Sequence, residues 1–312
     1  MYTCQRGAQS RTVSIRNLRY HALVWNETQG LDAKAPLVLL HGWMDVGASY
    51  QFMVDAFSEF FMQGRCVIAP DWRGFGQTPS GGADHYGFAD YLADLDFLLD
   101  QFAGDQAVDL VGHSMGGNVA MLYAGVRPER VRHVVNLEGF GMPPTRPEQA
   151  PPRYAKWMDE LKALHRGELA LQTYDSLTGV ARRLMKTNPR LSPDKAHWLA
   201  QHWSAPKIQA DGSTRWQILG DAAHKIVSAQ LYRAEEVHAA WQRISAPVLA
   251  VEADSDSMYA WYHGRYTLDH YHERLQAVAQ CRIAVIEDAG HMLHHDQPQR
   301  LAALIEPFLA TD

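Results

Sequence analysis

The sequence of 312 residues has little of what marks the specialised classes of protein. Its three cysteines, Cys4, Cys66 and Cys281, are far apart and form no Cys-x-x-Cys pair, so no disulfide framework is expected. A reducing cytoplasm is therefore the expected location. No apolar run approaches the ~20 residues that a membrane helix needs, so no membrane insertion is expected. The first thirty residues lack the apolar block of a secretory signal.

Positive charge is also scarce. Lys and Arg number 29 against 35 Asp and Glu, which gives a formal net charge of −6, and no basic run is present. The sequence thus lacks the electrostatic footprint of a nucleic-acid-binding protein. With 46% hydrophobic and 21% charged residues, it has the composition of an ordinary globular protein with a sizeable core.

Short apolar runs alternate with helical patterns over much of the chain. Residues 12–16 and 20–25 predict a β-hairpin, and apolar residues recur at helical spacing over 88–102 and 301–309. Short continuous apolar runs of this kind are typical of strands buried on both faces of a parallel sheet. They lie at 36–41, 66–69, 107–111, 131–137, 248–251 and 283–286. The alternation predicts an α/β fold with helices on both faces of the sheet.

The alternation stops after residue 137 and resumes at residue 246. Between them lie a proline-rich loop and amphipathic stretches at 154–165, 177–186 and 194–203, without strand-like runs. We therefore predict one α/β core, residues 1–139 and 246–312, interrupted by a mainly helical cap, residues 140–245.

The strongest local motif is VDLVGHSMGG at residues 108–117, in which an apolar strand, a Gly-x-Ser-x-Gly turn and a helical run follow one another. Such a turn presents the serine hydroxyl away from the sheet, and its small residues let neighbouring backbone pass close by. The helix N-terminus also favours negative charge on an attacked carbonyl. Ser114 is therefore the candidate nucleophile; the alternative is a glycine-rich turn with an incidental serine.

A nucleophilic serine needs a base, because its hydroxyl is almost never ionised near neutral pH. In sites built on this turn, the histidine follows the last strand of the sheet. His291 comes shortly after the apolar run 283–286 and is the candidate base. His294 and His295 stand close by, but their spacing matches no zinc motif, so no metal site is expected.

Three carboxylates compete for the role of the triad acid. Asp256 follows the strand at 248–251 and is the preferred candidate, with Asp254 on the same loop. Glu138 directly follows the strand at 131–137 and is the alternative next in order. Either strand end can bring a carboxylate to the same imidazole.

Two backbone N–H groups must face the oxygen that becomes negative during attack on a carbonyl. One is expected from Met115, directly after the nucleophile. The other is expected from Trp43, in the His-Gly-Trp loop that follows the strand at 36–41.

Taken together, these motifs resemble the α/β-hydrolase superfamily with a helical cap. The matching segments are His41-Gly42-Trp43, Asp71-x-Arg73-Gly74-x-Gly76-x-Thr78, Gly112-His-Ser114-Met-Gly116-Gly117 and Asp288-Ala-Gly-His291. The resemblance implies an eight-stranded, mostly parallel sheet whose first strands are antiparallel, with a cap inserted after the sixth strand.

The segment Asn136-Leu-Glu138-Gly-Phe-Gly141 is similar to the serine hydrolase-like branch of that superfamily. Some relatives carry their acid after the sixth strand, which keeps Glu138 in consideration. Many members read Gly-x-x-Asp after the seventh strand, where this sequence has Ala253-Asp254-Ser255-Asp256.

A serine at the turn favours acyl transfer, whereas the dehalogenases and epoxide hydrolases of the superfamily use aspartate there. We therefore predict a carboxylesterase-like serine hydrolase that acts through an acyl-enzyme on small to medium acyl substrates, with neither a metal nor an organic cofactor. The same triad also suits a thioesterase, an amidase or a carbon–carbon bond hydrolase. Hypotheses of other classes are a receptor-like binding protein on a hydrolase scaffold and a non-catalytic interaction module. The oligomeric state is not predicted.

Overall fold

The computed structural model describes residues 2–27, 34–209 and 211–311. Its main sheet has the strand order β1-β2-β4-β3-β5-β6-β10-β11. The first two strands are antiparallel to their neighbours, and all pairs from β4 onward are parallel. This confirms the predicted eight-stranded, mostly parallel sheet. The strands are β1 (Gln9–Ile15), β2 (Leu18–Trp25), β3 (Lys34–Leu40), β4 (Arg65–Pro70), β5 (Val108–His113), β6 (Val131–Leu137), β10 (Val248–Ala253) and β11 (Cys281–Ile286).

Alternate residues of a central strand face opposite sides of the sheet, and both sides are covered. In β3, Val38 and Leu40 join one hydrophobic cluster, whereas Leu37 and Leu39 join the other. Burial on both faces explains why the sequence of this strand is a continuous apolar run.

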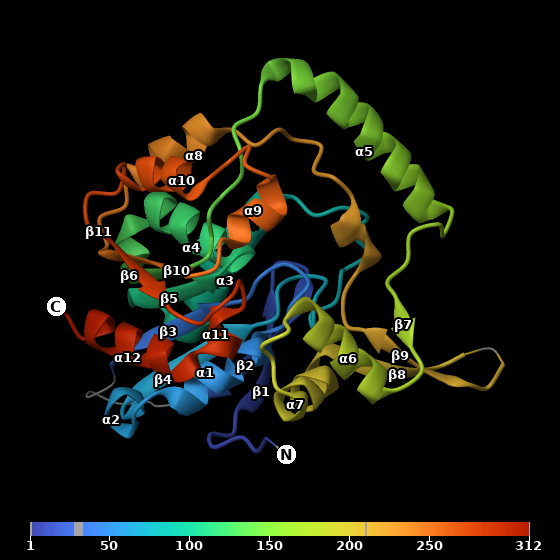
Figure 1. The fold of residues 1–312 in the computed structure, drawn as a ribbon, viewed down its shortest axis with the longest axis horizontal. Helices are drawn as coiled ribbons and strands as arrows, with labels where there is room; N and C mark the ends of the chain where they lie inside the picture. The colour runs from blue at the N-terminus through green and yellow to red at the C-terminus, as the bar shows by residue number, and fades with distance from the viewer. Residues whose placement is uncertain (1, 28–33, 210, 312) are drawn as a thin grey trace.

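Helices pack on both faces of the sheet (Figure 1). Residues of α3, α4, α8 and α10 belong to one cluster, and residues of α1 and α12 belong to the other. The helices of the core are α1 (Gln51–Ala56), α2 (Glu59–Met62), α3 (Phe88–Ala103), α4 (Met115–Val126), α8 (Ala234–Trp241), α9 (Ser257–Tyr262), α10 (Leu268–Leu275), α11 (Leu293–Asp296) and α12 (Pro298–Leu309). Short 3-10 turns are η1 (Gly47–Tyr50), η2 (Pro128–Arg130), η3 (Pro147–Gln149) and η4 (Ala222–Lys225).

The segment between β6 and α8 forms a separate layer. It contains the helices α5 (Ala150–His165), α6 (Leu177–Thr187) and α7 (Pro193–Trp203). It also contains a small antiparallel sheet of β7 (Thr173–Tyr174), β9 (Thr214–Ile218) and β8 (Ser204–Ile208), which the sequence analysis had not predicted. Figure 1 shows α5 at the periphery, away from the main sheet. None of the described helices is both long and apolar enough to cross a membrane.

The inserted layer packs on the core through α6 and α7. The helices α6 and α7 share a hydrophobic cluster with Val46 and Phe52, which belong to the loop and helix after β3. The helix α8 lies inside the segment predicted as cap, yet it packs directly on α4. At Gly125 of α4, a Cβ would come within 2.1 Å of the backbone oxygen of Ala240. Residues 234–241 therefore pack as part of the core.

Candidate active site

Ser114 lies on a sharp turn between β5 and α4. Its backbone has φ 52° and ψ −113°, and its N–H donates to the Leu137 oxygen at 2.8 Å. A non-glycine residue with positive φ is strained, and such strain collects at functional sites. A Cβ at Gly116 would lie 2.0 Å from the Leu40 oxygen, and a Cβ at Gly112 would lie 2.3 Å from the Gly116 oxygen. Only glycine fits at these two positions, so the small residues of the motif are required by packing.

The two backbone N–H groups expected to bind the oxyanion, those of Met115 and Trp43, have no hydrogen-bond partner among the described residues. Met115 is the first residue of α4, where an N–H has no partner within the helix. The Trp43 N–H makes no hydrogen bond among the described residues. Its loop is held in place by two indole groups: the Trp43 Nε1–H donates to the His224 oxygen at 3.3 Å, and the Trp203 Nε1–H donates to the Met44 oxygen at 3.0 Å.

His291 follows β11 and meets a carboxylate from the end of β6. Its Nδ1 lies 3.1 Å from Glu138 Oε2, and the Glu138 side chain is only 1% exposed. Glu138 has φ 57°, a backbone conformation that is strained for a residue other than glycine. Its other oxygen, Oε1, accepts a hydrogen bond from the Ala253 N–H at 2.8 Å, and the Ser257 hydroxyl donates to Oε2. Ser257 is a supporting residue that the sequence analysis missed.

The two aspartates proposed from sequence have other partners in the structure. Asp256, the preferred candidate, is the N-cap of α9 and accepts a hydrogen bond from the Tyr259 N–H at 2.9 Å. Asp254 accepts from the N–H groups of Asp288 and Ala289 at 2.8 and 3.1 Å, which hold its pKa below the usual range. The structure therefore brings Glu138, and neither aspartate, into hydrogen-bond contact with His291.

Ser114 and His291 line one cavity of about 660 Å³, between the carboxyl ends of the strands and the inserted layer. Among the described residues, no hydrogen bond joins the Ser114 hydroxyl to His291. Such bonds are often long in unliganded enzymes and tighten when substrate binds. Trp261, 58% exposed, lies edge-on to the His291 ring with centroids 5.9 Å apart.

The rest of the cavity wall is mainly apolar, with a few polar groups. Its apolar lining includes Met44, Leu171, Leu184, Leu191, Leu199 and Trp203. Arg183 and Lys225 add positive charge to the wall, and no carboxylate pairs with either among the described residues. A cavity of this size and character suits a small to medium organic substrate.

A group of buried polar side chains lies beneath the nucleophile and the base. His113 Nε2 is 2.7 Å from the His291 backbone oxygen, and the rings of His113 and His294 are 4.5 Å apart. Burial lowers the pKa of both His113 and His294 well below the usual value, so both rings are neutral. Burial raises the pKa of nearby Asp45 to about 7. The spacing of residues in the sequence did not indicate that Asp45, in the loop after β3, belongs to this buried polar group.

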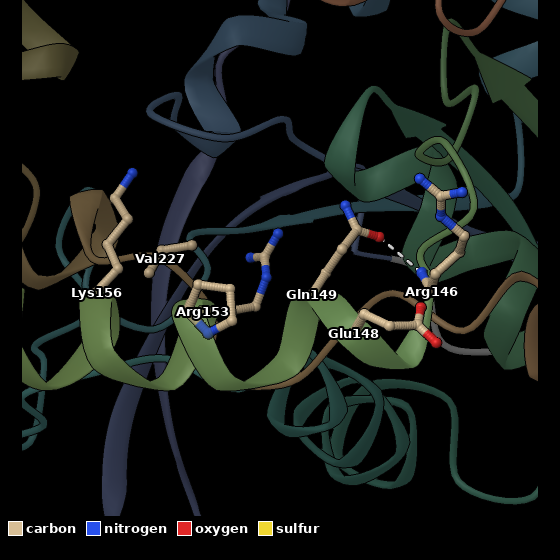
Figure 2. A pocket seen from close by; sticks show the side chains of 7 residues that line it. Arg146, Glu148, Gln149, Arg153, Lys156 and Val227 are labelled. Atoms are coloured by element: carbon tan, nitrogen blue, oxygen red, sulfur yellow. Dashed lines mark hydrogen bonds between the residues drawn. The ribbon is translucent and has the colours of Figure 1, made fainter.

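A second hollow, of about 680 Å³, lies along α5 and away from these groups. Figure 2 shows Arg146, Arg153 and Lys156 projecting to the same side, with the Arg146 N–H donating to Gln149 Oε1 at 2.6 Å. Its lining residues include no serine, cysteine or histidine, so only the first of these two cavities contains a candidate nucleophile with a neighbouring histidine.

Comparison with known proteins gives one family. Residues 35–298 match the family model described as alpha/beta hydrolase fold. A serine hydrolase-like protein of Danio rerio is 31% identical over 125 residues, which cover 39% of this chain and 35% of that protein. An sn-1-specific diacylglycerol lipase of Mus musculus is 26% identical over 304 residues, which cover 94% of this chain and 87% of the lipase.

The shorter matches concern only part of each relative: the chain covers 35%, 38% and 32% of the length of the first three curated relatives. Among solved structures, the thioesterase domain from the curacin biosynthetic pathway superposes with a TM-score of 0.77 at 23% identity. That match covers 96% of this chain and 99% of the domain, and it shows the shared fold.

Proposed function

This chain belongs to the α/β-hydrolase family, and from that premise we propose that it is a serine hydrolase that cleaves carboxylic esters through an acyl-enzyme. The proposed triad is Ser114 as nucleophile, His291 as base and Glu138 as acid. Glu138 takes the role that the sequence pattern assigned first to Asp256.

One observation carries the proposal: a buried carboxylate is hydrogen-bonded to a histidine that shares a cavity with the strained serine. The 3.1 Å contact between Glu138 Oε2 and His291 Nδ1 supports a ring with its proton on Nδ1 and its Nε2 lone pair free for the serine. Two further donors, the Ala253 N–H and the Ser257 hydroxyl, keep the carboxylate in that position. The geometry thus supports the orienting role that a triad acid performs.

In the proposed mechanism, Ser114 Oγ attacks the ester carbonyl while His291 Nε2 takes the hydroxyl proton. The carbonyl oxygen becomes negative and binds the N–H groups of Trp43 and Met115. Glu138 stabilises the imidazolium, which then gives its proton to the leaving alkoxide, so that an alcohol departs. A water that His291 deprotonates attacks the acyl-enzyme and releases the acid and free Ser114.

The mainly apolar cavity supports a substrate with a small to medium acyl group. The similarity to a diacylglycerol lipase extends over nearly the whole chain and supports an ester as the scissile bond. Thioester, amide and carbon–carbon bond cleavage use the same triad and are the competing functions.

A kinetic comparison of p-nitrophenyl esters, from acetate to decanoate, tests this proposal. We expect steady turnover with a preference for short to medium acyl chains, and a loss of at least about 10³-fold in kcat for Ser114→Ala. Release of about one equivalent of p-nitrophenol without further turnover would instead favour a receptor-like protein. An unchanged rate in Ser114→Ala would contradict the proposal.

A further inference from the structure

Asp45, His113 and His294 bring three potential metal ligands together beside the cavity that contains Ser114 and His291. They come from the loop after β3, the end of β5 and α11, and one ligand atom of each lies within 4.8 Å of the others. All three residues are more than nine-tenths buried. Asp45 Oδ2, His113 Nδ1 and His294 Nδ1 have no hydrogen-bond partner among the described residues. Unpaired buried polar atoms are costly, and one on each of the three residues of this group requires an explanation.

The protonation state of His113 follows from its one hydrogen bond. Its Nε2 contacts the backbone oxygen of His291 at 2.7 Å, and a carbonyl oxygen can only accept. Nε2 must therefore carry the hydrogen. Because the buried ring is neutral, Nδ1 carries a lone pair that nothing among the described residues fills.

Ser49 places a similar restriction on the histidines of α11. Its hydroxyl oxygen contacts both His294 Nε2 at 3.0 Å and His295 Nε2 at 2.6 Å. One hydroxyl has one hydrogen, so at least one of the two rings must donate its Nε2–H to Ser49. A neutral ring that does so keeps a lone pair on Nδ1, and the Nδ1 atoms of both rings are unpaired. His294 thus has an available tautomer in which its Nδ1, like that of His113, carries a lone pair that can bind a metal ion.

With Asp45 ionised, the three residues offer a carboxylate oxygen and two imidazole lone pairs, none of which receives a hydrogen bond among the described residues. We infer that this cluster is a binding site for a transition-metal dication of the zinc class. Neutral imidazole and carboxylate are preferred ligands of Zn²⁺, and three protein ligands leave a fourth position for a water or substrate atom. Asp45 and His113 also line the catalytic cavity, which provides a route for the ion.

Metal binding at this place would disturb the residues that perform catalysis. Ligand atoms of a tetrahedral zinc site are about 3.3 Å apart, whereas those of the cluster lie within 4.8 Å of one another, so ion binding involves a contraction of up to about 1.5 Å. Asp45 lies two residues after Trp43, His113 directly precedes Ser114, and His294 lies three residues after His291. Contraction therefore pulls on the loops that carry the oxyanion donor, the nucleophile and the base. Under the hydrolase function proposed above, we expect the bound ion to inhibit.

Calorimetric titration of the EDTA-treated full-length chain with ZnCl₂ tests the site without measuring activity. We expect one Zn²⁺ per chain, and at least about tenfold weaker binding in both Asp45→Asn and His294→Gln. Thermal unfolding of each metal-free variant checks that it is folded. His238→Gln, a change at an exposed histidine outside the cluster, is the matched control and should bind as the unaltered chain does.

His291→Gln separates this site from the triad, because a catalytic histidine can itself bind zinc. Retained binding in this variant supports the cluster as the site; loss of binding assigns the ion to the triad and overturns the inference. Absence of saturable binding, or binding that neither cluster variant weakens, would also overturn it and would leave a water or a proton as the partner of these atoms. These outcomes do not depend on ester turnover, so failure of the metal site and failure of the proposed function are distinguishable.

Discussion

Glu138 and His291 stand 153 positions apart in the sequence, and their side chains meet at 3.1 Å where β6 and β11 end. The two strands are not neighbours, because β10 lies between them. Carboxyl ends of parallel strands share one edge of the sheet, so a side chain on one strand end can reach across a neighbour. The backbone of β10 takes part in the contact, since the Ala253 N–H holds the other oxygen of Glu138.

Replacement of this carboxylate by an amide should stop catalysis. In Glu138→Gln, the side-chain oxygen can still accept from the Ala253 N–H, but the amide NH₂ then faces His291. It favours the wrong tautomer of the ring and cannot stabilise the imidazolium. We expect kcat for a p-nitrophenyl ester to fall by about 10³- to 10⁴-fold, with a folded protein by circular dichroism.

The matched control is Asp256→Asn, at the carboxylate that the sequence favoured. Asparagine caps a helix as well as aspartate does, so α9 should persist and kcat should change by no more than about threefold. A large loss in this variant, together with a small loss in Glu138→Gln, would assign the acid to Asp256.

Gly116→Ala should disrupt the turn that presents the nucleophile. The added Cβ would meet the Leu40 oxygen at 2.0 Å, and that oxygen belongs to the neighbouring strand β3. We expect the free energy of unfolding to fall by at least about 2 kcal/mol in urea titrations, with loss of esterase activity. Gly7→Ala is the control: no atom lies within 4 Å of its Cβ, and both properties should remain unchanged.

His224 should make the fold sensitive to acid. Its ring is stacked between Phe75 and Tyr86, and its Nε2–H donates to the Arg73 oxygen at 3.1 Å. Burial lowers its pKa to about 4 from an ordinary value of 6.5. Below pH 6.5 the unfolded chain therefore takes up a proton that the folded chain does not. The contribution of His224 to the free energy of unfolding is therefore fully present above pH 6.5 and is lost as pH falls toward 4.

When pH falls from 7 to 5, the shifted pKa of His224 alone should lower the free energy of unfolding by about 2 kcal/mol. In His224→Gln, urea unfolding should show a correspondingly smaller drop between these two pH values, whatever the stability at pH 7. His238→Gln, at an exposed position, should show the same drop as the unaltered chain. An equal drop in His224→Gln would show that other groups account for the acid sensitivity.

The main sheet could be predicted from sequence because its strands are buried on both faces. The run 131–137 coincides with β6, and the strand expected at 36–41 is β3 with ends shifted by one or two residues. The small sheet of the inserted layer gave no such signal. Its strand β9, with the sequence TRWQI, has only Ile218 buried, so its pattern is neither continuous nor clearly alternating.

The position of the candidate nucleophile could be predicted because one local motif sets its geometry. The choice of the acid stayed ambiguous because two strand ends each carry a carboxylate. The strand-turn-helix pattern around Ser114 specifies its own backbone, including the two glycines. Glu138 and Asp256 both follow a strand, and sequence does not show that one side chain turns inward at positive φ while the other caps a helix. Asp45 was missed because no spacing rule links the three segments of the buried cluster.

Covalent labelling with a fluorophosphonate, with mass spectrometry to locate the adduct, tests whether Ser114 is a nucleophile activated by His291. We expect about one adduct per chain at Ser114, and much slower labelling of His291→Ala, because the hydroxyl then lacks its base. An adduct at another residue, or labelling at Ser114 whose rate does not depend on His291, would contradict this expectation.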